Sequence, residues 1–204
     1  MDSTQKYLKE RLKQKKLISP VCIYSDFQTN GIGSRGNIWV GIKGNLFFSF
    51  SLKIKDLPND LKIESSSIYF SYILKEILQN LGSKVWIKWP NDFYMDDKKI
   101  GGVITEVIKD DIICGIGLNL KNAPDGFGVL DIAVDKKELI EKFLKNLKNL
   151  VSWKQVFRKY EVEFYKSKIF LTNLDNKKQI SLKDAKLLDD GSLEINGERI
   201  YSLR

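Results

Sequence analysis

The residue types that could do chemistry are concentrated in KWPNDFYMDDKKIGGVITE, residues 88–106. Pro90 lacks a backbone donor and favours extended geometry in the residue before it, so a strand that reaches this point must end or bend. The remainder predicts a hairpin that carries Lys99 and Gly102 on or beside a core strand. A lysine on a rigid strand can hold an anion in place, and glycine lets a ligand approach the backbone. The alternative is a hairpin with a polar turn and a glycine bulge.

A second segment, QTNGIGSRGNIW at residues 28–39, contains the pattern Gly-x-Gly-x-x-Gly that is typical of dinucleotide-binding loops. That interpretation needs a strand before the glycines and a helix directly after them, because the helix N-terminus binds the pyrophosphate. Residues 21–24 predict the strand, but residues 38–50 are rich in aromatic, β-branched and glycine residues without helical periodicity. The dinucleotide interpretation therefore fails, and the loop needs another explanation.

A third segment, CGIGLNL at residues 114–120, places Asn119 among apolar residues and next to glycines that suit close backbone approach. A buried asparagine must satisfy both its oxygen and its amide hydrogens, and an adenine edge offers a matching donor and acceptor. An asparagine at a strand end that is satisfied by the protein itself is the commoner case.

The composition restricts the chemistry open to these segments. The chain has 204 residues and no histidine, which excludes Ser-His-Asp and Cys-His catalysis and most zinc sites. Its net charge of +8 favours anionic partners, or reflects a lysine-rich solvated surface. No apolar run is long enough to span a membrane, and the N-terminus is charged where a signal peptide would be apolar. We therefore expect a cytoplasmic protein whose two cysteines, Cys22 and Cys114, are buried rather than bonded.

The elements that must position these segments follow from periodicity. Helices are predicted to begin at residues 3–4, to cover residues 65–82, and to begin near residue 135 and extend beyond residue 153. Strand-like runs lie between them, at residues 21–25, 46–54, 84–89, 92–96, 100–108 and 112–118. After residue 167 only short strands are expected, with a hairpin turn at Asn196-Gly197. The fold class is therefore α+β, with a mixed β-sheet packed with helices over residues 1–165 and a small β-barrel over residues 166–204.

Together the three segments resemble those of the biotin–protein ligases, also called biotin–acetyl-CoA-carboxylase ligases. The family's opening Ser-Thr-Asn resembles residues 3–5, its Gln-x-x-Gly-Arg-Gly loop residues 28–39, its Lys-Trp-Pro-Asn-Asp and Lys-x-x-Gly residues 88–102, and its Gly-x-Gly-x-Asn residues 115–119. The resemblance implies that biotin and magnesium-ATP give biotinyl-adenylate, which then modifies one lysine of a biotin carboxyl carrier protein of acetyl-CoA carboxylase or a related carboxylase. Biotin's carboxylate is itself the nucleophile, so the first step needs alignment and charge neutralisation rather than histidine.

The resemblance also implies roles for individual residues. Those that would bind biotin are Ser3, Thr4, Gln28, Gly31, Lys99, Gly102 and Gly115. Those that would bind ATP or the adenylate are Arg35, Trp39, Asn91, Asp92, Lys99 and Asn119. Lys99 and Arg35 would be catalytic and Asp92 would lie near magnesium. The glycines of residues 28–39 would form a flexible lid that excludes water from the adenylate.

The sequence departs from the family pattern at three places. Ile32, Ser34 and Asn37 stand in the loop at positions where the family usually has arginine, which leaves Arg35 alone there. Gln5 replaces the asparagine of the first motif. Two residues precede Ser3, so either the sheet lacks the usual edge strand or the start codon is late. We also expect no helix-turn-helix domain and therefore no repressor activity.

Two other functions are consistent with parts of the sequence. A lipoate or octanoate ligase is similar in fold and chemistry, but its flexible acyl chain would have no use for the polar groups at residues 3, 4 and 28. A basic nucleic-acid-binding module predicts salt-dependent binding without turnover, but the distinctive residues here are glycines and apolar pocket formers. We therefore expect no nucleic acid or membrane as partner, an acidic carrier domain attracted by the positive charge, and a monomer or homodimer.

Overall fold

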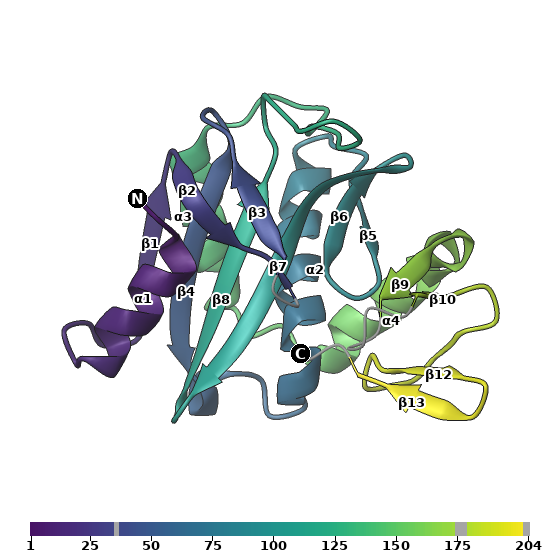
Figure 1. Ribbon diagram of the computed structural model, residues 1–204. Helices are drawn as coiled ribbons and strands as arrows, with labels where there is room; N and C mark the ends of the chain where they lie inside the picture. The colour runs from purple at the N-terminus through teal and green to yellow at the C-terminus, as the bar shows by residue number, and fades with distance from the viewer. Residues whose placement is uncertain (35–36, 174–178, 202–204) are drawn as a thin grey trace.

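A six-stranded sheet forms the centre of the protein in the computed structural model, which describes residues 1–34, 37–173 and 179–201 (Figure 1). Across the sheet the strands are β1 (Val21–Ser25), β4 (Leu46–Lys53), β8 (Asp111–Leu118), β7 (Lys98–Ile108), β6 (Asp92–Met95) and β5 (Trp86–Lys88). Every neighbouring pair is antiparallel. The α+β class is confirmed, but the mixed sheet was wrong, because tight connections between β5, β6, β7 and β8 force successive strands to alternate in direction.

Helices cover both faces of this sheet. α2 (Ser66–Asn80), α3 (Lys136–Leu147) and α4 (Trp153–Glu163) lie on the side of the main hydrophobic core, and α1 (Thr4–Lys13) packs on β4 and β8 from the other side (Figure 1). Side chains alternate along β4, so Phe48 and Phe50 point into the core, where their rings contact Phe143 and Phe70. Ser49 therefore points to the α1 side, where the candidate site lies.

The helix starts agree with the predictions from polar caps. The Ser3 hydroxyl accepts a hydrogen bond from the backbone N–H of Lys6, and Asp135 accepts from the first turn of α3. The predicted third helix is two helices, because α3 ends at Leu147 and α4 begins after its own cap at Ser152. Two short 3₁₀ turns, η2 (Ile54–Asp56) and η3 (Ile63–Ser65), connect β4 to α2.

The glycine segment contains a hairpin that the sequence analysis missed. β2 (Gln28–Ile32) pairs with β3 (Ile38–Gly41), with Gly31 opposite Trp39 and Gly41 opposite Gln28. A Cβ atom on Gly31 would lie 2.5 Å from the carbonyl oxygen of Trp39, so the pairing depends on the missing side chain. Glycine is unfavourable in strands in general, which is why a residue-by-residue prediction gave a loop here. Arg35 lies outside the described residues.

The C-terminal part is rich in short strands, as predicted. After η4 (Phe164–Ile169), β9 (Leu171–Asn173) pairs with β10 (Gln179–Ser181), and β11 (Lys186–Leu187), β12 (Leu193–Ile195) and β13 (Glu198–Ile200) form a second sheet. Within the described residues these sheets do not close into the predicted barrel. Strands of two or three residues are too short for closure, and the segment packs on the main body instead, where Trp89 Nε1 donates to the Gly191 carbonyl at 2.8 Å.

The remaining predictions from composition concern the cysteines and membrane spans. Cys22 and Cys114 are both free, and Cys114 is buried as predicted, whereas Cys22 is only partly buried because it lies on the edge strand β1. Partial burial still raises the pKa of the Cys22 thiol to about 11. Of the helices in the described part of the chain, none combines the length and the apolar character that crossing a membrane requires.

Candidate ligand-binding site

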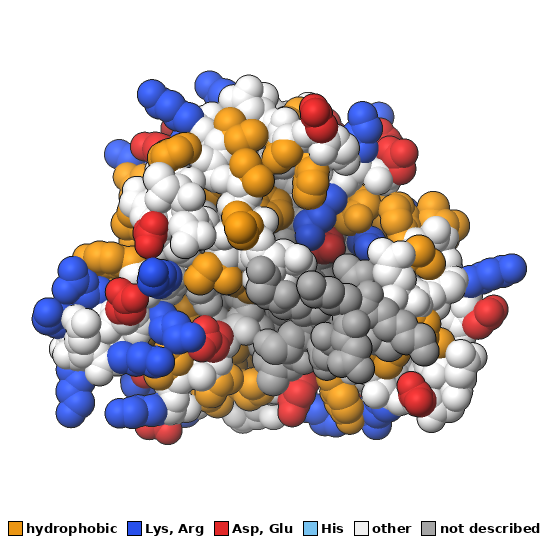
Figure 2. Space-filling view, in the orientation of Figure 1, with side chains coloured by type: hydrophobic (Ala, Val, Ile, Leu, Met, Phe, Trp, Pro, Cys, Tyr) orange, Lys and Arg blue, Asp and Glu red, His pale blue; other side chains and the backbone are white. Residues whose placement is uncertain are grey.

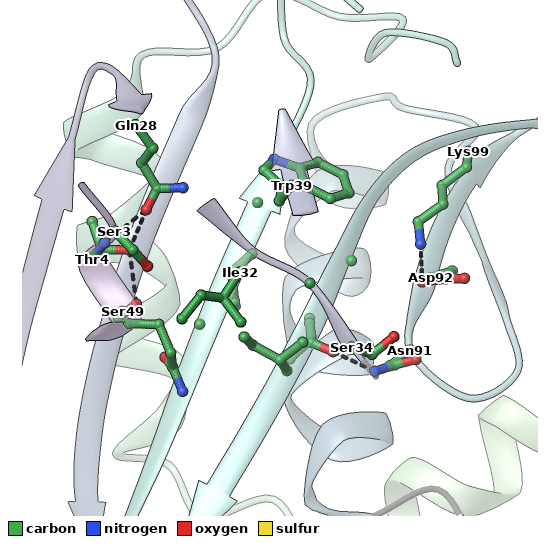
Figure 3. Close-up of a pocket in the computed structure, with 18 residues that line it drawn as sticks. Ser3, Thr4, Gln28, Ile32, Ser34, Trp39, Ser49, Asn91, Asp92 and Lys99 are labelled. Carbon is green, nitrogen blue, oxygen red and sulfur yellow. Dashed lines mark hydrogen bonds and ion pairs between the residues drawn. The ribbon is translucent and has the colours of Figure 1, made fainter. Parts of the chain in front are cut away.

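A pocket lies between the first turn of α1, the β2–β3 hairpin and the strands β4, β7 and β8 (Figure 3). About 480 Å³ of space lies among its lining residues when the open mouth is counted. The predicted site residues that line it are Ser3, Thr4, Gln28, Trp39, Asn91, Asp92, Lys99, Gly102 and Gly115. Segments that are more than 100 residues apart in the sequence therefore meet in one cavity.

One end of the pocket is neutral and buried, and we call Thr4, Gln28 and Ser49 its polar end. Ser49 Oγ donates to Thr4 Oγ1 at 2.9 Å, and Thr4 Oγ1 donates to Gln28 Oε1 at 3.1 Å. The backbone N–H of Thr4 also donates to Gln28 Oε1, at 2.7 Å. All three residues are buried, so α1, β2 and β4 hold a directional hydrogen-bond chain in fixed geometry.

The other end carries charge, and we call Lys99 and Asp92 its charged end. Lys99 Nζ lies 2.6 Å from Asp92 Oδ1, and the two side chains are 27% and 23% exposed. Both project from neighbouring strands, β7 and β6, whose pairing contains a register shift between Phe93 and Tyr94. Bulges of this kind re-aim side chains, so the glycine-bulge alternative is compatible with a lysine that faces the pocket. Figure 3 shows the polar end and the charged end on opposite sides of the pocket.

The phenol beside the charged end stays protonated. Burial of Tyr94, and after it the charge of Asp92, raises the pKa of this phenol well above its ordinary value. Tyr94 is therefore not an acid or base near neutral pH, and Lys99 and Asp92 are the ionisable side chains that face the pocket within the described residues.

Trp39 lies between the two ends (Figure 3). Its indole rests on the backbone of Gly117, where an added Cβ would lie 2.8 Å from Nε1, and its ring is 5.8 Å from Lys99 Nζ. Trp39 Nε1 is buried and has no hydrogen-bond partner among the described residues. A buried N–H without an acceptor is costly, so this donor is available to a ligand.

Three predicted residues have structural partners in the protein. Asn91 lines the pocket, but its amide donates to the carbonyl of Val103. Asn119 does not line it: its Nδ2 donates to the Gly128 carbonyl at 3.2 Å and its Oδ1 accepts from Asn45 at 3.3 Å. Gly31 does not line the pocket either, and it pairs with Trp39 across the β2–β3 hairpin. Their roles toward a ligand stay predictions.

The pocket also contains residues that the sequence analysis did not select. Ser49 could have been found from LFFSFSLK, because strand alternation places its serines opposite the aromatic face. Gln5 was noted only as a departure from the family motif, yet it is buried and lines the cavity. No local pattern distinguishes it from a surface glutamine of α1.

A magnesium ion that arrives with nucleotide phosphates would fit this donor set. Asp92 is the single carboxylate among the described lining residues, and the described chain contains no cluster of three or more potential Cys, Asp or Glu ligands. Magnesium commonly binds one or two protein carboxylates and completes its shell with phosphate oxygens and water. Asp92 therefore suits a shared site rather than a cage made by protein alone.

Comparison with known proteins agrees with this geometry. The family model described as "Biotin/lipoate A/B protein ligase family" matches residues 1–119. The chain is similar to the Helicobacter pylori biotin acetyl coenzyme A carboxylase synthetase, solved with bound biotinylated ATP, with 43% identity, a TM-score of 0.94, and coverage of 98% of this chain and 95% of that one.

Two more distant relatives are also similar. The biotin protein ligase of Aquifex aeolicus, solved with biotin and ATP, is 25% identical with a TM-score of 0.73, over 100% of this chain and 92% of that chain. The bifunctional ligase/repressor BirA of Escherichia coli is 32% identical over 127 residues, which are 59% of this chain. The match spans 38% of that relative's length.

Proposed function

The chain belongs to the biotin/lipoate A/B protein ligase family, and we propose that it is a biotin–protein ligase. It would activate biotin with ATP to biotinyl-5′-adenylate and pyrophosphate, and then transfer biotin to a lysine of a carrier protein. The observation that carries the proposal is one pocket with a neutral, buried hydrogen-bond chain at one end and the Lys99–Asp92 pair at the other.

The polar end supports biotin over lipoate or octanoate. Biotin ends in a neutral ring with a urea group, which needs fixed donors and acceptors when it is buried. The chain from Ser49 through Thr4 to Gln28 provides such groups, with the Ser3 hydroxyl beside it. A lipoyl or octanoyl group has no polar ring, so it would leave these groups without partners and bind less well.

The charged end supports adenylation. A carboxylate oxygen of biotin attacks the α-phosphorus of ATP, the phosphorus–oxygen bond to pyrophosphate breaks, and negative charge builds up on the phosphoryl oxygens. Lys99 is positioned to neutralise that charge because it is fixed on β7, and a charge-assisted bond is about twice as strong as a neutral one. Magnesium bound with ATP, with Asp92 as a protein ligand, would supply further neutralisation. Arg35, outside the described residues, is proposed as a second cation.

The transfer step uses the same end of the pocket. The amine of the acceptor lysine attacks the acyl carbon of the adenylate, the carbon–oxygen bond to AMP breaks, and the nitrogen gives up a proton as the amide forms. Trp39 would stack on the nucleotide and exclude water, with Gly102 and Gly115 leaving room for the ligand. Asn91 and Asn119 are proposed to contribute to nucleotide binding by fixing the backbone around the nucleotide, through their hydrogen bonds to Val103 and Gly128.

The proposed partner is a biotin carboxyl carrier protein of acetyl-CoA carboxylase or a related carboxylase. Figure 2 shows lysines and arginines gathered over α1, whose sequence TQKYLKERLK carries four lysine or arginine residues and one glutamate. Such a surface attracts an acidic carrier domain and accelerates its encounter. We further propose that the enzyme works in the cytoplasm as a monomer or homodimer, with residues 1–165 as its catalytic domain and residues 166–204 as a smaller appended domain.

ATP–pyrophosphate exchange tests the proposal directly. The purified protein is supplied with biotin, lipoate or octanoate as the sole acid, and transfer to a carrier domain is followed by streptavidin blotting. We expect exchange and transfer with biotin alone. Exchange only with lipoate or octanoate would assign the protein to the other branch of the family, and no exchange with any acid would contradict adenylation.

A further inference from the structure

Gln5 is a buried polar residue whose side-chain oxygen has no hydrogen-bond partner among the described residues. Its side chain lies on the first turn of α1, the residue is 5% exposed, and it lines the same pocket as the polar end. Gln5 Oε1 is fully buried and accepts no hydrogen bond from the described residues. A buried carbonyl oxygen without a donor destabilises the folded protein, so its position in the pocket points to a donor that arrives with a ligand.

The position of this oxygen depends on a glycine. A Cβ atom on Gly115 would lie 2.7 Å from Gln5 Oε1, so a side chain at this position would displace the oxygen from where it lies. Gly115 lies directly opposite Ser49 in the β4–β8 pairing, and directly opposed side-chain positions in an antiparallel pair share one face of the sheet. Gln5 Oε1 therefore lies next to the hydrogen-bond chain of the polar end.

The polar end must supply a hydrogen-bond acceptor for each N–H of a urea ring. A urea ring presents two N–H donors and one carbonyl acceptor. Gln28 Oε1 already accepts two hydrogen bonds, from the backbone and the hydroxyl of Thr4, and Thr4 Oγ1 already accepts one from Ser49. A carbonyl oxygen has two lone pairs, so Gln28 Oε1 is saturated, and Gln5 Oε1 is the buried carbonyl oxygen beside it that accepts no hydrogen bond from the described residues.

We propose that Gln5 Oε1 accepts a hydrogen bond from one ureido N–H of biotin, which makes Gln5 a specificity-determining residue. This inference rests on the proposed function, because it takes biotin as the ligand. It also gives an unusual pair of expectations. Removing the acceptor relieves an unsatisfied group in the free protein and removes a partner in the complex, so ligand-free stability and biotin affinity should move in opposite directions.

The test compares Gln5→Met, which keeps the length of the side chain but not its oxygen, with Gln5→Glu, which keeps an acceptor. Gln14→Met, at the exposed end of the same helix, is the matched control. Calorimetry measures the Kd of biotin and of two cyclic carbamate analogues, in each of which one ring N–H is replaced by oxygen. Thermal unfolding without ligand measures stability.

We expect Gln5→Met to raise the Kd of biotin by about 10-fold without lowering the melting temperature, and to bind biotin and one of the two carbamates equally well. Gln5→Glu should keep the wild-type preference for biotin over that carbamate. Wild-type affinity in Gln5→Met, or unchanged discrimination against both carbamates, would overturn the role of Gln5 while leaving the ligase proposal intact. Failure of the wild-type protein to bind biotin at all would overturn both.

Discussion

The polar end and the charged end of the pocket differ in charge, burial and the number of bonds that hold them. The polar end is neutral and buried, and Gln28 Oε1 receives two donors from Thr4, which itself receives one from Ser49. The charged end is partly open to solvent, and within the described part of the chain it consists of one ion pair, between Lys99 and Asp92. The polar end is fixed where α1, β2 and β4 meet, whereas the charged end is fixed by the neighbouring strands β6 and β7.

This difference suits two tasks. A neutral ring is recognised best by groups whose geometry is set before it arrives, because an unmatched polar group in a dry site costs more than a matched one contributes. A reacting phosphate needs a cation that can change partners. Lys99 and Asp92 are both partly exposed, so solvent weakens their attraction and Lys99 can exchange Asp92 for a phosphate oxygen. The comparison predicts that substitutions at the charged end lower the rate of ATP–pyrophosphate exchange, whereas substitutions at the polar end weaken the binding of biotin.

The largest effect is expected for Lys99→Met. Removing the cation that faces the developing phosphoryl charge should lower the rate of ATP–pyrophosphate exchange by about 100- to 1000-fold. The Kd of biotin should rise by only about 10-fold, from loss of one charge-assisted bond. Lys98→Met, at the exposed neighbouring position of β7, is the control and should keep wild-type exchange. Equal loss of rate and affinity in Lys99→Met would remove the distinction between the two ends.

Gln28→Met tests the polar end. Two buried donors of Thr4 lose their shared acceptor, so the Kd of biotin measured by calorimetry should rise by about 10- to 100-fold. Exchange at saturating biotin should fall by less than 10-fold, the reverse of the pattern at Lys99. Gln179→Met, an exposed glutamine on β10, controls for the substitution itself. A large loss of rate at saturating biotin would show that the polar end also takes part in the chemical step.

Asp92→Asn separates the two roles available to the carboxylate. The amide keeps the shape of the side chain but binds a metal ion more weakly than a carboxylate does. The magnesium concentration needed for half-maximal exchange should therefore rise by about 10-fold. The Kd of biotin should not change, because the polar end is intact. Asp97→Asn, in the exposed hairpin turn, is the control. An unchanged magnesium requirement would leave Asp92 as a partner of Lys99 only.

The charged end and the polar end also differ in how far they could be predicted from the sequence. Lys99 was predictable from the sequence, because it stands nine residues after Pro90 in one hairpin whose turn and strands are local. Asp92, its partner in that hairpin, was selected through the family resemblance. The polar end was predicted only through the family resemblance, since Thr4, Gln28 and Ser49 meet across three elements. Gln5 was missed because its environment is set by Gly115, 110 positions away, and the packing of a helix on a strand at that distance leaves no local signal in the sequence.

The sheet predictions failed for a related reason. Strand positions follow from composition, but whether a sheet is mixed or antiparallel depends on how its connections run, and whether short strands close a barrel depends on what they pack against. Leu182, Leu193 and Ile195 belong to the same hydrophobic core as α2 and the central sheet, so the C-terminal strands are held from outside rather than by one another. Trp153, whose Nε1 donates to the Asp189 carbonyl, reinforces this packing.

The smallest effect is expected for Ser49→Ala, and it tests whether the polar end acts as a chain. Thr4 keeps both bonds to Gln28, so only the outermost link is lost and the Kd of biotin should rise by about 2- to 5-fold, corresponding to about 0.5–1 kcal/mol. Ser51→Ala is a matched control, because Ser51 is buried two residues along the same strand, accepts one hydrogen bond from Ser19, and does not line the pocket. Both variants should lose similar stability in urea unfolding, and only Ser49→Ala should lose affinity. If both bind biotin as the wild type does, recognition rests on Thr4 and Gln28 alone, and the chain contributes to the fold of the polar end but not to its affinity.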